Sequence, residues 1–168
     1  MRRFAVAFLG LAVVVGLVSP ATSTGNEGTD ILEFDVMAGV SEPFTGMANP
    51  IRDVNGGGLP WELDRGEGEL RRNGQLRVKV DGLVLARRDP VPADLQGTNP
   101  VPEFMGIVSC LTSSGGVAET VNVATDPVPA TPEGDARIRD RVLLPRPCFA
   151  PIVFVASSTG SWFAVTGR

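Results

Sequence analysis

The sequence contains no histidine and no tyrosine, and it has only one lysine, two tryptophans and two cysteines among its 168 residues. Without histidine, Ser-His-Asp and Cys-His catalysis, histidine-ligated zinc or copper and the usual proton shuttle near neutral pH are excluded. A Ser-Lys dyad would depend on Lys79, which no Ser-x-x-Lys motif contains, and no Gly-x-Ser-x-Gly motif occurs. We therefore predict that the chain is not an enzyme, has no catalytic residues and uses no cofactor.

Long apolar runs are also missing, except at the N-terminus. Arg2 and Arg3 precede fifteen uncharged residues, 4–18, which are followed by the small residues Ser19 and Ala21. A basic start, a short apolar stretch and small residues at the −3 and −1 positions are typical of a secretory signal peptide. The alternative is a membrane anchor, but a spanning helix needs roughly 20 apolar residues. The pattern therefore predicts a secreted, extracellular protein.

The chain is expected to have three parts: a signal peptide at 1–21, with cleavage after Ser23 or Thr24 as an alternative, a polar tether at 22–29 and a single β domain at 30–168. Cleavage after residue 21 removes two basic groups, so 13 basic and 19 acidic groups remain, a net charge of −6. This acidic balance argues against nucleic acid as a partner, because phosphates select basic surfaces. A protein or a glycan is the expected partner, with no membrane span after cleavage.

The two cysteines, Cys110 and Cys148, are an even pair in a chain predicted to enter an oxidising compartment. Such pairs usually form a disulfide. Closing a loop of this length would restrict the unfolded chain by roughly 4 kcal/mol in the loop-entropy account. The alternative is two buried free thiols.

Short segments of alternating polarity, which indicate half-buried strands, recur along the chain. Residues 31–38 alternate, and Leu32, Phe34 and Val36 are expected on the buried face. Residues 66–81 form the clearest hairpin, because Asn73-Gly74 suits a two-residue type I′ turn. Further strands are predicted within 83–85, 104–111, 117–124, 136–144, 152–156 and 162–165.

Seven to nine strands, Gly/Pro-rich turns and the absence of an amphipathic helix favour an all-β domain. We predict an antiparallel β-sandwich, immunoglobulin-like or jelly-roll-like, with a β-barrel as the alternative.

Two groups of charged residues could carry chemistry or binding. Glu67 and Glu69 would share one face of a strand, roughly 7 Å apart, within the spacing that glycoside hydrolases use. A carboxylate-dependent glycoside hydrolase is therefore the alternative function, against an acidic edge that pairs with nearby arginines. Arg137, Arg139 and Arg141 would form either a patch for an anion or polysaccharide, or a solvated face that deters edge pairing.

Two Gly/Pro-rich loops, 49–61 and 87–102, are the predicted contact surface of a non-enzymatic exported protein, because binding residues concentrate in loops on a rigid scaffold. The triple glycine at 56–58 favours a structural loop anchored by Trp61, with close approach of a ligand as the alternative. A weak calcium site formed by Asp53, Asn55 and the carbonyls of residues 56–58 is the alternative, and no metal is predicted. The candidate binding residues are Asn49, Arg52, Asp53, Asn55, Gly56, Gly57, Gly58, Trp61 and Asn99.

Five segments together resemble a group of small exported bacterial proteins of unassigned function. They are Phe34-Asp35-Val36-Met37, Asn49-Pro50-Ile51-Arg52, Asn55-Gly56-Gly57-Gly58-Leu59-Pro60-Trp61, Gly97-Thr98-Asn99-Pro100-Val101-Pro102 and Ile107-Val108-Ser109-Cys110-Leu111. The resemblance spans nearly the whole chain after the signal peptide. It implies export and a shared β domain, and it assigns no catalytic residue.

Overall fold

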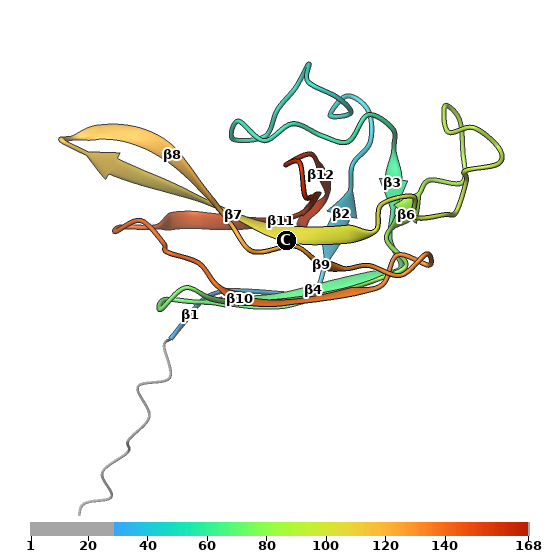
Figure 1. The fold of residues 1–168 in the computed structure, drawn as a ribbon. Coiled ribbons are helices and arrows are strands. Elements are labelled where there is room, and N and C mark those ends of the chain that lie inside the picture. Colours follow the sequence, from blue (N-terminus) through green and yellow to red (C-terminus); the bar gives the residue numbers. More distant parts are fainter. Residues whose placement is uncertain (1–28, 168) are drawn as a thin grey trace, which may run out of the picture.

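The computed structural model describes residues 29–167, so the predicted signal peptide and all but the last residue of the predicted tether lie outside the described residues. The described chain forms twelve strands and no helix (Figure 1). Three of the strands contain only two residues, and the other nine match the upper end of the predicted range. The predicted all-β fold is confirmed.

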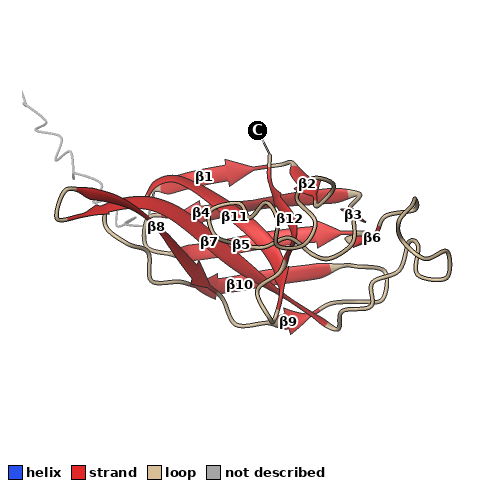
Figure 2. Cartoon of the chain, turned by 90° about the horizontal axis from the view of Figure 1, so that it is seen from above, coloured by secondary structure: helices blue, strands red, loops and turns tan. Residues whose placement is uncertain are grey.

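Two antiparallel sheets form the sandwich, and their strands run at an angle to each other (Figure 2). The sheet that we call sheet A has the order β1 (Asp30–Phe34), β4 (Arg65–Arg71), β5 (Gln75–Asp81), β10 (Ala136–Arg141). Sheet B has the order β2 (Met37–Gly39), β12 (Trp162–Thr166), β11 (Phe149–Ser157), β7 (Glu103–Ser114), β8 (Val117–Ala124), and β9 (Val128–Pro129) also pairs with β7. A separate pair joins β3 (Trp61–Glu62) to β6 (Val84–Leu85).

The first predicted strand, residues 31–38, is divided between the two sheets. β1 belongs to sheet A and β2 to sheet B, with Asp35 and Val36 between them. Crossing between sheets reverses the alternation, so Met37 is 6% exposed whereas Val36 is 49% exposed. The prediction that Val36 faces the core was therefore wrong, because a strand that changes sheet also changes which side chains point inward.

The predicted hairpin around Asn73-Gly74 is confirmed as β4 and β5, but its turn differs from the prediction. Gly74 has a positive φ of 86°, whereas Asn73 does not have a positive φ, so the turn is not type I′. The Gly74 amide donates to the Arg71 carbonyl, and the Asn73 side chain accepts from the Gln75 amide. A three-residue loop that ends in a left-handed glycine explains this geometry.

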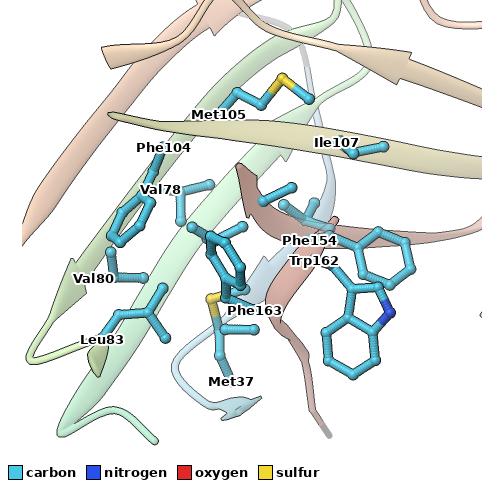
Figure 3. Close-up of a cluster of buried hydrophobic side chains, with 14 of the residues drawn as sticks. Met37, Val78, Val80, Leu83, Phe104, Met105, Ile107, Phe154, Trp162 and Phe163 are labelled. Atoms are coloured by element: carbon cyan, nitrogen blue, oxygen red, sulfur yellow. The ribbon is translucent and has the colours of Figure 1, made fainter. Parts of the chain in front are cut away.

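The main core lies between the two sheets, where alternate side chains of each sheet point inward. Sheet A contributes Leu70, Leu76, Val78, Val80 and Ile138, all buried. On the sheet B side, Phe104 and Phe163 (Figure 3) pack edge to face with ring centroids 5.8 Å apart. The Trp61 ring stacks on Phe163 with ring centroids 4.0 Å apart.

Part of the outer face of sheet B, over β12 and the neighbouring parts of β11 and β7, is covered by residues 41–60, which we call the covering loop (Figure 1). At its tip, Ile51 and Val54 exchange backbone hydrogen bonds around Arg52 and Asp53, which both have positive φ angles. This is a tight hairpin turn made without glycine. The Arg52 guanidinium donates to the Ser109 carbonyl of β7, and the Asn122 side chain of β8 donates to the Arg52 carbonyl. These bonds hold the covering loop against sheet B.

The predicted disulfide is confirmed. Cys110 of β7 is bonded to Cys148, which precedes β11, and the described residues contain no free cysteine. The bond closes a 38-residue separation and ties the interior of β7 to the start of the neighbouring strand, β11. A disulfide in an all-β chain fits an oxidising, extracellular location.

Candidate functional site

The outer face of sheet A, unlike that of sheet B, is open and hollowed. A groove of about 670 Å³ lies across its four strands. Its charged lining consists of Glu33 and Asp35 at the β1 side, Glu67 and Glu69 on β4, Arg77 and Lys79 on β5, and Arg137 and Arg139 on β10. The groove therefore brings together two charged groups that lie far apart in the sequence, Glu67 with Glu69 and Arg137 with Arg139.

Charge in the groove is ordered by strand. One row across the sheet reads Glu33, Glu69, Arg77, Arg139, in which each residue is directly opposite the next. The neighbouring row contains Glu67 opposite Lys79, which is opposite Arg137. The β1–β4 half of the groove is thus acidic, and the β5–β10 half is basic.

The central charges of this face are neutralised within the chain. Glu69 lies 3.3 Å from the Arg77 guanidinium and 3.4 Å from that of Arg71, and Glu67 lies 2.6 Å from Arg65. Lys79 pairs with Asp81 at 2.5 Å. The floor of the groove therefore presents little unbalanced charge.

The charges at the two rims are not neutralised. Within the part of the chain that the structure describes, Glu33, Asp35, Arg137 and Arg139 form no ion pair and no side-chain hydrogen bond. Directly opposed like charges, such as Arg77 with Arg139 and Glu33 with Glu69, weaken a sheet rather than stabilise it. The arrangement costs folding stability and leaves opposite charges at two rims about 14 Å apart, three strand spacings.

Trp61 and two of the three consecutive glycines have structural roles. Trp61 is 4% exposed in the aromatic core. Gly57 donates to the Trp162 carbonyl, and Gly56 donates to the Gly46 carbonyl. A Cβ at Gly56 would overlap the Phe44 carbonyl, whereas a Cβ at Gly58 would meet open space. Two glycine amides are therefore bonded within the chain, and close packing accounts for their lack of side chains.

The other candidate loop residues divide into two groups. The side chains of Asn49, Arg52 and Asn99 bind backbone carbonyls: Asn49 that of Pro43, Arg52 that of Ser109, and Asn99 those of Val101 and Thr131. Asp53 and Asn55 are exposed on the covering loop. The loop at 87–102 extends from the end of the sandwich, beside β3 and β6, apart from the covering loop in both views (Figures 1 and 2). Asn99 is therefore not gathered with the other candidates.

No group of three histidine, cysteine, aspartate or glutamate side chains within residues 29–167 could hold a metal ion. Those same residues include no helix long and apolar enough to span a membrane.

Glu33 and Asp35 were not among the residues singled out from the sequence. Their strand was predicted, and both were assigned to its polar face, but nothing in the sequence places β1 beside β4. The sequence does contain a usable signal: β4, β5, β10 and the segment 33–35 each carry charges of one sign at alternate positions, which the period of a strand directs to one face.

Comparison with protein-family models, with curated proteins and with solved structures finds no match. The resemblance to small exported bacterial proteins therefore stays a prediction.

Proposed function

We propose that the chain is an exported, non-enzymatic β-sandwich that binds an extended segment of a partner protein in the groove of sheet A, outside the cell or at the cell envelope. The observation that carries this proposal is the pair of oppositely charged, unpaired rims, Glu33 and Asp35 against Arg137 and Arg139. The disulfide and the N-terminal signal-peptide pattern support export.

The geometry of the groove selects the kind of segment. A peptide that lies parallel to the strands, between the acidic and the basic rim, in an extended conformation directs successive side chains toward opposite rims. Alternating basic and acidic residues would then place cations toward Glu33 and Asp35, and anions toward Arg137 and Arg139. A uniformly acidic polymer, including an acidic glycan, would be attracted to the basic rim at Arg137 and Arg139 and repelled by the acidic rim at Glu33 and Asp35.

The test compares two synthetic peptides of the same composition, one with alternating Lys and Glu and one with a Lys block followed by a Glu block. We expect the alternating peptide to bind more tightly, measured by isothermal titration calorimetry, and its affinity to fall with added salt. The double substitutions Arg137→Ala/Arg139→Ala and Glu33→Ala/Asp35→Ala should each weaken binding, whereas Arg88→Ala, in the exposed loop at 87–102, should not. Equal affinity for the two peptides would contradict the proposal.

The alternative, a glycoside hydrolase that uses Glu67 and Glu69, has one observation in its favour: both carboxylates line the groove. Their contacts with arginine instead support a structural role, because each is occupied by a cation of the chain itself. Turnover on a panel of polysaccharides that is lost in Glu69→Gln would establish the enzyme and overturn the non-enzymatic proposal.

A further inference from the structure

We infer that the free edge of β8 pairs with β8 of a second copy of this chain, so that sheet B continues across a symmetric dimer. β8 is paired on one side only, with β7, and its eight residues keep an unbroken register from Val117 to Ala124. Among the described residues, no further backbone hydrogen bond to β8 occurs. Every second residue of such an edge strand presents its amide and carbonyl outward, ready to pair.

The other sheet edges are protected and β8 is not. β10 carries Arg137, Arg139 and Arg141 at alternate positions, β1 has an irregular register between Asp30 and Leu32, and β2 has only three residues. Charged residues, irregularities and short length each deter pairing with another chain. β8 has one charged residue, Glu119, no proline and no bulge, and Val117 at its start is 69% exposed.

The position of β8 leaves room for a neighbour. β10, at the edge of sheet A on the same side, makes its main contacts with sheet B through β7 and β9. β8 therefore overhangs sheet A, and Figure 1 shows the β7–β8 hairpin extending beyond the sandwich. A second strand beside β8 would meet no other element of this chain in the same plane.

The sequence of β8 is suited to pairing with itself. A two-fold axis normal to the sheet keeps each side chain on its own face, so residues of the same parity must be opposite each other. With Thr120 on the axis, Thr120 lies opposite its own copy, Val117 opposite Val123 and Ala118 opposite Asn122. Glu119, the only charged residue, then lies opposite Val121 and does not face its own copy. Thr–Thr is a favourable cross-strand pair, and valine suits the surface of a sheet.

In this register Thr120 is the one residue of β8 that lies opposite its own copy, and this position provides the test. Thr120→Lys would place two ammonium groups opposite each other only in the dimer, and Thr120→Glu would do the same with two carboxylates. Each variant alone should weaken self-association by more than about tenfold, and an equimolar mixture of the two should restore it. Sedimentation velocity over a concentration series measures all three, and the restored association also shows that both variants are folded.

Ser158→Lys, an equal charge change at the exposed turn before β12, is the matched control and should leave association unchanged. Hydrogen exchange at the outward-facing amides of β8 should slow as the wild-type protein is concentrated. A wild-type chain that stays monomeric at every concentration would refute the dimer. A dimer that persists in Thr120→Lys would refute the β8 interface.

Discussion

The outer faces of the two sheets differ in composition and in whether the chain covers them. Sheet B has a largely apolar outer face, on which Phe154 and Trp162 pack with ring centroids 5.8 Å apart, and the chain covers part of it with its own loop. Sheet A has an outer face lined by rows of charge, and no segment of the described chain covers it. Apolar surface is stabilised by burial, whereas ordered like charges are not. The difference indicates that sheet B serves the stability of the fold and that sheet A is available for contact.

The largest change in stability is expected from a substitution beneath the covering loop, on the outer face of sheet B. Trp162→Ala should destabilise the protein by about 3–5 kcal/mol, because it removes a buried aromatic ring beneath the covering loop. The free energy of unfolding from urea denaturation measures the change. Phe149→Ala, which truncates an aromatic residue that is 60% exposed on the neighbouring strand, should change stability by less than about 0.5 kcal/mol. Similar losses for both would show that the covering loop does not shield sheet B.

A smaller effect is expected from the glycines that fit the covering loop to the sheet. Gly56→Ala should cost about 1–3 kcal/mol, because its Cβ would overlap the Phe44 carbonyl and the backbone must move. Gly58→Ala enters open space and should change stability by less than about 0.5 kcal/mol. Thermal denaturation of the two variants side by side distinguishes them. If Gly58→Ala were the more damaging, the positions assigned to these glycines would be wrong.

The smallest change in stability is expected on the outer face of sheet A, and it is an increase instead of a loss. Arg139→Gln should raise the free energy of unfolding by about 0.2–1 kcal/mol, because it removes a like charge from opposite Arg77. The gain should shrink as salt screens the repulsion. Arg88→Gln, in an exposed loop, is the control and should show no gain. Lower stability for Arg139→Gln would mean that this arginine supports the fold, and would weaken the case for the groove.

Local pattern accounts for much of the fold. The hairpin of β4 and β5 was predicted from alternating residues around Asn73-Gly74, and the pairs β7–β8 and β11–β12 are also close in sequence. Errors arose where a distant partner decides the structure. The alternation of residues 31–38 has no signal for a change of sheet, so Val36 was placed in the core. The turn at Arg52 and Asp53 was also not predicted, because arginine rarely adopts a positive φ and long-range hydrogen bonds hold the turn there.

The candidate site was predicted only in fragments. Glu67 and Glu69 were expected on one face, and so were Arg137, Arg139 and Arg141, because the two-residue period of a strand fixes which side chains share a face. That β10 lies beside β5, more than fifty residues earlier in the chain, is a long-range pairing that no local pattern specifies.

By itself, the sequence determined that this is a β protein, that its cysteines are suited to a disulfide, and that histidine-dependent chemistry is excluded. Only the tertiary structure decided that acidic β1 and β4 lie beside basic β5 and β10 in one groove, that a loop covers sheet B, and that β8 is left as an open edge. The physical reason is that side-chain direction is set within a strand, whereas the neighbours of a strand are set by the packing of the whole core.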